Sequence, residues 1–274
     1  MAIITISRQA GSLGRVIGKM LKDELNFEYL DKAKIEEILV SKYGIPEEHF
    51  EKFDEKKPAF WDIFSSDKDR YLHFMKTAIY EFARKGDTII MGRGGQVLLK
   101  DVPGVLHLCI VAPQELRIER IKSRYNCNDK LAEQIIRHSD YDRTGFHKFF
   151  FHVNWEDSSL YDLMINTQTY TAEHAVNLIK TSLDIFKAFY QQEETAQRLA
   201  DLCLGQDIVT HIAYKEKIPI QFLEAQVQNG VVTLRGSTIT SDDIQRCETV
   251  ARQVPGVKDV VNEVYFIPNT YGMA

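Results

Sequence analysis

Short apolar runs recur along the first two thirds of the chain with the length and composition of β-strands. One of them, interrupted only by His107, is typical of a strand that is buried on both faces of a sheet. The runs that predict strands are Ile3–Ile6, Phe27–Leu30, Thr88–Met91, Val105–Val111 and Tyr161–Ile165.

Segments with helical spacing separate these runs. Apolar residues between Val16 and Leu25 recur every three to four positions, with charged residues between them, which predicts an amphipathic helix. Similar patterns predict helices over Lys32–Ser41, Asp67–Lys85 and Thr171–Gln191. Strands that alternate with helices indicate an α/β fold with a parallel sheet covered by helices. Ligands of such sheets bind beyond the carboxyl ends of the strands, where the loops beginning at Ser7, Gly92 and Ala112 are expected.

The pattern changes near residue 195. We interpret the polar segment Gln192–Arg198 as a boundary between a domain over residues 1–195 and a second over residues 196–274. Asn229-Gly230 between two strand patterns is a strong hairpin signal, because both residues tolerate positive φ. Ser241 is the expected N-cap of a late helix. The second domain is predicted to be a small α+β module of order αββαβ, with elements near Asp207–Lys217, Ile220–Val227, Val231–Arg235, Asp242–Gln253 and Val257–Phe266.

Composition narrows the possible classes of protein. The 274 residues are 44% hydrophobic, enough for one large core or for one medium and one small core. A net charge of −5 argues against nucleic acid as a partner. No apolar stretch approaches the roughly 18 to 20 residues of a transmembrane helix, and no signal peptide is apparent, so we expect a cytoplasmic protein. The four cysteines lack the spacing of a zinc site or a disulfide framework.

The first strand runs into the sequence SRQAGSLGR, Ser7–Arg15, and then into a helix. Such a loop aims free backbone N–H groups and the positive end of the helix dipole at one point, where phosphate binds. On the phosphate-loop pattern G-x-x-x-x-G-K-[ST], the lysine becomes Gly14 and the metal-binding Ser/Thr becomes Arg15. An ordinary strand–helix turn is the alternative.

Several arginines could bind phosphate. Arg93 lies in a glycine-rich loop after a buried strand and could pair with a phosphate through two hydrogen bonds, although a surface arginine in a flexible turn fits the same pattern. Arg117, Arg120 and Arg124 share one helix face, as residues of a solvated face also would.

A polar stretch with Arg137, Asp140 and Arg143 runs into the aromatic segment Phe146–Phe151. A lid that closes over phosphates and excludes water fits this pattern. A helical hairpin whose charges pair with each other is the alternative. We expect His138, His147 and His152 to be structural or exposed to solvent.

Taken as a set, several segments resemble the cytidylate kinase-like proteins, relatives of the nucleoside monophosphate kinases with a P-loop fold. The resemblance covers Met1–Leu183 and rests on ISRQAGSLGR, YLDKAKIEEIL, MGRGGQVLLKDVPGVLHLCIVAP, RIERIKSR, DYDR and NWEDSSLYDLMINT. The C-terminal segment, with NGVVTLRG and VPGVKDVVNEV, resembles a BON domain over Thr195–Pro268, a module that associates with a small ligand or a partner.

The resemblance implies roles for particular residues. Arg93 corresponds to an arginine that contacts the nucleoside monophosphate, and Asp31 to an aspartate of the same region. Asp140 and Arg143 correspond to an aspartate and an arginine of the lid. The chain departs from the pattern at Met91, which replaces an acidic residue, and at Glu37, which stands where an arginine would hold the acceptor phosphate.

The combined expectation is a phosphotransferase that moves the γ-phosphoryl group of ATP to a nucleotide such as CMP. Alternatives are a nucleotide-binding sensor without turnover and a kinase of another small metabolite. An oligomer is compatible with either class. In the kinase hypothesis Asp31 and Arg93 bind the acceptor, and Ser12 or water holds Mg²⁺. The expected ATP-binding residues are Arg8, Gly11, Ser12, Gly14 and Arg15, and the expected catalytic residues are Arg15, Arg137, Asp140 and Arg143.

Overall fold

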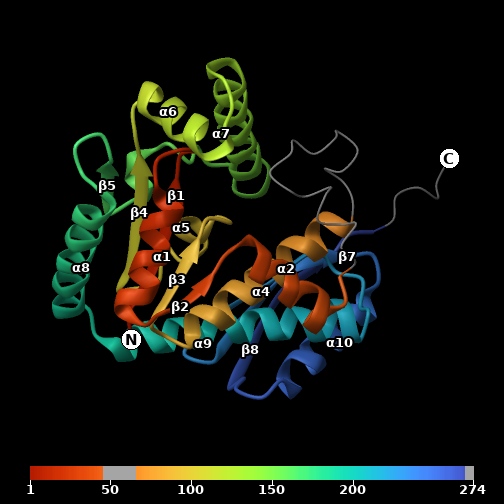
Figure 1. The fold of residues 1–274 in the computed structure, drawn as a ribbon. Coiled ribbons are helices and arrows are strands. Elements are labelled where there is room, and N and C mark those ends of the chain that lie inside the picture. Colours follow the sequence, from red (N-terminus) through yellow and green to blue (C-terminus); the bar gives the residue numbers. More distant parts are fainter. Residues whose placement is uncertain (46–65, 269–274) are drawn as a thin grey trace. The chain divides into compact units, whose positions relative to one another are not determined.

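The computed structural model describes residues 1–45 and 66–268 of the chain. Within it the chain forms two compact units, Met1–Gln192 and Glu193–Ala274. The first is a parallel sheet flanked by helices, and the second is a small three-stranded sheet with helices (Figure 1). This architecture confirms the fold class predicted from the sequence.

The sheet of the first unit has five parallel strands in the order β2-β3-β1-β4-β5. Three of the predicted strands lie side by side at its centre, because β1 pairs with both β3 and β4. The loops that follow these three strands therefore meet at one edge of the sheet. The strands are β1 (Ile3–Arg8), β2 (Glu28–Leu30), β3 (Thr88–Met91), β4 (Val105–Val111) and β5 (Leu163–Asn166).

Helices cover the sheet and form the wall above its carboxyl edge. Helix α1 follows β1 directly, and α6 and α7 form a hairpin after β4 (Figure 1). The helices of this unit are α1 (Gly14–Leu25), α2 (Lys32–Tyr43), α4 (Ser66–Arg84), α5 (Gly95–Leu98), α6 (Gln114–Tyr125), α7 (Asp129–Phe151) and α8 (Ala172–Phe189), with a short 3-10 helix η2 (Ser158–Leu160).

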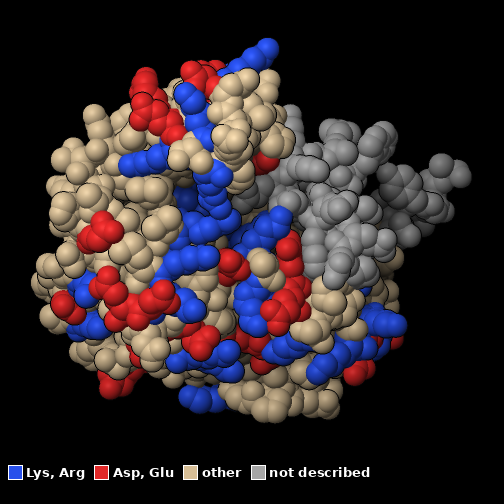
Figure 2. Space-filling view, in the orientation of Figure 1, with Lys and Arg blue, Asp and Glu red and all other residues tan. Residues whose placement is uncertain are grey.

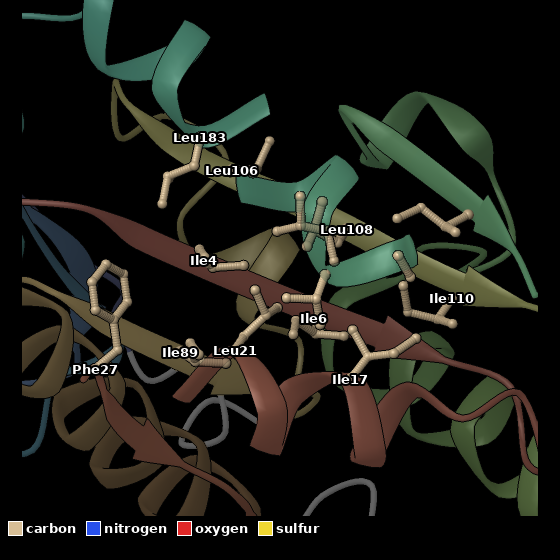
Figure 3. Packing of buried hydrophobic residues seen from close by; sticks show 14 of the residues in the cluster. Ile4, Ile6, Ile17, Leu21, Phe27, Ile89, Leu106, Leu108, Ile110 and Leu183 are labelled. Atoms are coloured by element: carbon tan, nitrogen blue, oxygen red, sulfur yellow. The ribbon is translucent and has the colours of Figure 1, made fainter. Parts of the chain in front are cut away.

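One core cluster packs α1 and α8 onto the same face of this sheet (Figure 3). Ile17 and Leu21 of α1 are fully buried against Ile4 of β1 and Leu106 of β4. These are the apolar positions of the predicted amphipathic helix and of the buried strand runs. Because β1 is fixed on both sides by paired strands and by this core, the loop at its end starts from a rigid support.

The second unit has an αββαβ order, as predicted, and a mixed sheet of order β6-β7-β8. Strands β6 and β7 are antiparallel, whereas β7 and β8 are parallel. Asn229 and Gly230 join β6 to β7 with φ values of 53° and 83°, the backbone that the hairpin signal requires. The elements are α9 (Gln192–Val209), a π-helix η3 (Thr210–Lys215), β6 (Gln221–Gln228), β7 (Val231–Thr238), α10 (Ser241–Gln253) and β8 (Asp259–Phe266).

Two details of the predicted elements differ in the structure. The helix predicted near Asp207–Lys217 begins earlier, at Gln192, and so includes the polar segment Gln192–Arg198, within which the two compact units divide. Acidic residues in the first turn and the burial of Leu199 and Cys203 explain why a polar segment is helical here. The N-cap of α10 is Thr240, and Ser241 is the first residue inside that helix.

Among the described residues, no helix combines the length and the apolar character that crossing a bilayer requires.

Candidate phosphate-binding site

The loop between β1 and α1 presents backbone N–H groups for which the described residues offer no acceptor. Gly11 and Leu13 have φ values of 79° and 68°, and Leu13 caps α1 without a side-chain hydrogen bond. Within residues 1–45 and 66–268, no acceptor binds the N–H groups of Gly11, Leu13, Gly14, Arg15 and Val16. Successive N–H groups in such a conformation, at the positive end of a helix, form an anion-binding concavity.

A single carboxylate ties this loop to the α6–α7 hairpin. Asp140 of α7 accepts hydrogen bonds from the Ala10 N–H at 2.9 Å and from Nη1 of Arg143 at 2.7 Å. Its second oxygen accepts from Nη1 of Arg117 at 2.5 Å. The charges of the predicted lid therefore do pair with each other, as the alternative interpretation held, but they also hold the loop.

Two arginines of α6 face the loop, although the sequence pattern favoured a solvated face. Arg117 is buried and donates to the Ala10 carbonyl at 3.4 Å. Arg120 donates to the Gly11 carbonyl at 3.3 Å and to the hydroxyl and carbonyl of Thr167 at 2.9 and 2.8 Å. Arg124 alone is exposed. Arg117 and Arg120 lie in the first turns of the helix that follows the central strand β4, close to the carboxyl edge of the sheet. This position in the sequence could have identified them.

Arg93 is buried in the loop after β3, not exposed in a flexible turn. Three successive residues, Gly92, Arg93 and Gly94, have φ values of 74°, 52° and 71°, so the loop turns sharply back under the sheet edge. The guanidinium lies over the ring of Phe146, 5.2 Å from its centroid, and its Nη2 is 4.0 Å from an oxygen of Glu36. The arginine is therefore held in position before any ligand binds.

These elements enclose a narrow cleft, open to solvent, with a cavity volume of about 10 Å³. Three guanidinium groups line it, from the end of β1, the loop after β3 and the middle of α7. Gly92 leaves the space that the first of them needs, because a Cβ atom there would lie 2.4 Å from Nη1 of Arg8. Figure 2 shows Lys and Arg side chains gathered in a hollow on this face. The lining residues are Ser7, Arg8, Gly92, Arg93, Arg143, Phe146, His147 and Trp155.

A buried polar network supports the wall that carries Arg143. His147 contacts the Arg143 carbonyl through Nδ1 at 2.8 Å and the Gln96 amide nitrogen through Nε2 at 3.0 Å. A carbonyl accepts and an amide nitrogen donates, so these two contacts fit the tautomer that carries its proton on Nδ1. Trp155 donates to the hydroxyl of Thr144 at 3.0 Å. The predicted structural role of His147 fits these contacts.

Cys109 of β4 lies beside this network. Burial raises the pKa of its thiol to about 12, so it stays protonated and inert as a nucleophile.

The other predicted site residues lie around the same loop in different settings. Arg15 is exposed in the first turn of α1, and Arg137 is exposed on α7 one turn before Asp140. Asp31 caps α2 by accepting the Lys34 N–H at 3.1 Å. Burial, then the charge of Asp31, raises the pKa of Tyr29, whereas Arg8 and Arg15 act in the opposite direction, so these charges share one neighbourhood.

Ser12, the predicted metal ligand, is fully buried, and its hydroxyl donates to the Gln9 carbonyl at 2.9 Å. In the described part of the chain, no group of three or more His, Cys, Asp and Glu residues could hold a metal ion. The side chains of this loop therefore stabilise its backbone, and the N–H groups and arginines are what it offers to a ligand.

Comparisons with known proteins identify the family of each part of the chain. The model of the cytidylate kinase-like family matches residues 3–169, and the model of the BON domain matches residues 203–268. A cytidylate kinase of Methanocaldococcus jannaschii is 25% identical over 187 residues, which cover 68% of this chain and 99% of that protein. A cytidylate kinase of Haloarcula marismortui is 26% identical over 165 residues, covering 60% of this chain and 80% of that protein.

Among solved structures, an uncharacterized protein from Eubacterium ventriosum shares the fold, with a TM-score of 0.54 and 22% identity. The similarity covers 67% of this chain and 99% of that one. The family match extends over more than half of the chain and includes the loop between β1 and α1, the loop after β3 that carries Arg93 and the α6–α7 hairpin. The chain belongs to the cytidylate kinase-like family.

Proposed function

We propose that this protein is a nucleotide kinase, which transfers the γ-phosphoryl group of ATP to a nucleoside monophosphate such as CMP. The observation that supports this most directly is the cleft with three guanidinium groups, which begins where the N–H-rich loop begins. Phosphoryl transfer needs little covalent chemistry from the protein. It needs the two substrates in line and the phosphate charge neutralised, and this site offers both.

In this proposal the loop residues Gly11–Arg15 bind the ATP phosphates through backbone N–H groups. Arg8 and Arg143, which both line the cleft, stabilise the transferred phosphoryl group. A guanidinium can take the place of the missing loop lysine, because it keeps its charge and presents a planar pair of donors to phosphate. The need is large, since losing one preorganised charge stabiliser costs on the order of 2.7 to 4 kcal/mol in the transition state.

Arg93 and Asp31 form the proposed acceptor side. The relatives' printed name, cytidylate kinase, supports CMP as the acceptor. Arg15 and Arg137 are exposed here and would approach the phosphates when α7 closes over them. Asp140 would act by holding Arg143 and the loop together.

Mg²⁺ would enter with ATP and screen the charge of its phosphates. Mg²⁺ keeps several waters and is commonly bound through substrate phosphates. Ser12 retains its oxygen lone pairs, because its hydroxyl donates to Gln9, but its burial requires it to reorient before it could reach an ion. The ATP phosphates and water are therefore the main ligands that we propose.

Turnover assays separate this proposal from its alternatives. The purified protein, with ATP and Mg²⁺, should form ADP in the presence of CMP or another nucleoside monophosphate. ATP binding without ADP formation from any acceptor would favour the sensor, which the missing lysine at Gly14 suggests. ADP formed only with acceptors that lack a phosphate would favour another small-metabolite kinase, which the acidic Glu36 beside Arg93 suggests.

Replacing Arg93 tests the acceptor site. We expect Arg93→Ala to raise the acceptor KM by about 10- to 100-fold with little change in the KM for ATP, since hydrogen bonds to charged groups contribute about 1.5–3 kcal/mol. Arg93→Lys should recover only part of the loss, because it keeps the charge but not the paired donors. Arg84→Ala, at an exposed position in the last turn of α4, is the matched control. An unchanged acceptor KM in Arg93→Ala would remove Arg93 from the site.

A further inference from the structure

Three consecutive carbonyl groups of the phosphate-binding loop are each held from the same side. Arg117 donates to the Ala10 carbonyl at 3.4 Å, and Arg120 donates to the Gly11 carbonyl at 3.3 Å. The Ser12 carbonyl accepts from the hydroxyl of Thr167 at 3.1 Å. The donors come from α6 and from the residue that follows β5, both of which are distant from the loop in sequence.

Because the peptide bond is planar, the direction of each held carbonyl also fixes the direction of the N–H group in the same peptide. In a trans peptide the C=O and the N–H point in opposite directions, and the chain has no cis peptide bond in its described part. Holding the Ala10 carbonyl on the α6 side therefore directs the N–H of Gly11 away from α6. In the same way, holding the Ser12 carbonyl directs the N–H of Leu13 away.

The N–H group between these two, that of Ser12, differs from them because it has an acceptor within the loop. The N–H of Ser12 bonds to the Gln9 carbonyl within the loop at 3.3 Å, whereas those of Gly11 and Leu13 have no acceptor in the part of the chain that is described. The two unused donors are also those of the residues with positive φ. Alternating backbone of this kind forms an anion-binding nest.

Arg120 and Thr167 act as one unit behind the nest. A hydroxyl has one proton and two lone pairs, so the hydroxyl of Thr167 can accept from Arg120 at 2.9 Å and donate to a carbonyl. Of the two carbonyls within reach, that of Ser12 is nearer, at 3.1 Å, and that of Val111, at 3.3 Å, already accepts the Thr167 N–H at 2.9 Å. Thr167 is 1% exposed, so its hydroxyl is removed from bulk water. Arg120 forms no ion pair with a described carboxylate, so its positive charge stays behind the loop uncompensated, in contrast to Arg117 beside Asp140.

We propose that Arg120 and Thr167 are positioning residues of the phosphate site, which hold the loop carbonyls back and so present the N–H groups of Gly11 and Leu13 to a polyphosphate. This inference rests on the proposed function, because it concerns how the same loop binds ATP. This arrangement gives the loop, which lacks the usual lysine, a positive charge on the side of its carbonyls, from Arg120. On the opposite side it presents two oriented donors, the N–H groups of Gly11 and Leu13.

Paired substitutions at Thr167 test the proposal. Thr167→Val removes the hydroxyl and keeps the shape, whereas Thr167→Ser keeps the hydroxyl. With inorganic tripolyphosphate as the probe, calorimetry should show a Kd about tenfold higher for Thr167→Val, the effect of one lost hydrogen bond, and a nearly unchanged Kd for Thr167→Ser. Arg120→Lys, which keeps the charge but cannot hold the hydroxyl and both carbonyls, should resemble Thr167→Val.

A second readout distinguishes orientation from general loss of stability. In the full-length chain labelled with ¹⁵N-glycine and ¹⁵N-leucine, tripolyphosphate should shift the amide signals of Gly11 and Leu13 in the wild type and in Thr167→Ser. Both shifts should be much reduced in Thr167→Val and Arg120→Lys. The acceptor-side arginine is untouched in these variants, so CMP binding should be retained.

The outcomes separate the two proposals. If the wild type binds no tripolyphosphate and no ATP, the kinase proposal and this one both fail. If the wild type binds but folded Thr167→Val binds with the same Kd and the same amide shifts, the positioning role is overturned and the kinase proposal stands. Should Thr167→Val fail to fold, Arg120→Lys decides by the same two measurements.

Discussion

Individual polar side chains of this protein act mainly by binding backbone groups. Asp140 fixes one loop N–H, and Arg117, Arg120 and Thr167 fix loop carbonyls. Each contact satisfies a backbone group of the loop, partly buried at Ala10 and Gly11 and buried at Ser12. A backbone group left fully buried without a partner costs about 1–3 kcal/mol. The same residues that stabilise the loop therefore determine what the loop can bind.

Buried histidines make stability depend on pH at the residue scale. Burial, followed by the charge of Lys76, lowers the pKa of His73 from 6.5 to about 4 in the folded chain, and burial also lowers the pKa of His107. Below pH 6.5 the unfolded chain takes up protons that the folded chain rejects, so stability is lost as the pH falls from about 6.5 to about 4.

We expect the unfolding free energy of the first unit to fall by about 2 kcal/mol between pH 7 and pH 5 through His73 alone. Urea titrations followed by tryptophan fluorescence measure it, because both tryptophans of the chain, Trp61 and Trp155, belong to the sequence of the first unit. In His73→Gln this pH dependence should shrink by the same amount. An identical decline in the variant would show that other groups cause it.

At the scale of elements, local sequence signals and tertiary packing together determine the conformation of the β6–β7 hairpin. The hairpin between β6 and β7 has the turn that Asn229-Gly230 predicts, but a helix also secures it. Asp201 of α9, which is 5% exposed, accepts the N–H groups of Asn229 at 2.8 Å and of Gly230 at 3.1 Å. The hairpin of the second unit therefore depends on α9 as well as on its own turn residues.

Removing this carboxylate should loosen the hairpin. We expect Asp201→Ala to reduce the protection of β6 and β7 by about 2 kcal/mol, or roughly 30-fold in amide exchange, because two backbone donors lose a charged acceptor. Hydrogen exchange read by mass spectrometry on the full chain measures this. Glu193→Ala, exposed in the first turn of the same helix, should leave the exchange rates unchanged. Equal protection in Asp201→Ala would mean that the turn residues alone hold the hairpin.

At the scale of the whole molecule, the two units have separate cores. The cluster around Ile17 and Leu21 belongs to the first unit, and the cluster around Val232 and Leu234 belongs to the second. All groups of the proposed site lie in the first unit. We therefore propose that the site is complete without residues 193–274.

A chain that ends at Gln192 tests this. We expect it to fold and to bind tripolyphosphate with the Kd of the full chain, within about a factor of two, because no site residue is removed. Circular dichroism and calorimetry check folding and binding together. If the shortened chain aggregates or binds much more weakly, the second unit contributes to the stability or the function of the first.

The strands at the centre of the sheet could be predicted almost residue by residue. Thr88–Met91 and Val105–Val111 have the same limits in the sequence analysis and in the structure. Their apolar runs are local patterns, and the carboxyl ends of neighbouring parallel strands must meet at one edge. Arg8 and Arg93 could be chosen for that reason, whereas Arg143 was chosen from the polar stretch before Phe146–Phe151 and from the family resemblance. The predicted boundary near residue 195 did not show that α9 crosses it, because polar residues suit both a loop and an exposed helix face.

The sequence by itself determined the α/β architecture, the loop with its unused N–H groups and the arginines available to line a cleft, because hydrophobic period and turn chemistry act over a few residues. Only the tertiary structure decided which of those arginines meet the loop and that Thr167 joins them. The contacts of Arg117, Arg120 and Thr167 with loop carbonyls span 107, 109 and 155 residues of chain. A helical face shows which side chains point the same way, whereas the packing of the sheet and the hairpin determines what they face.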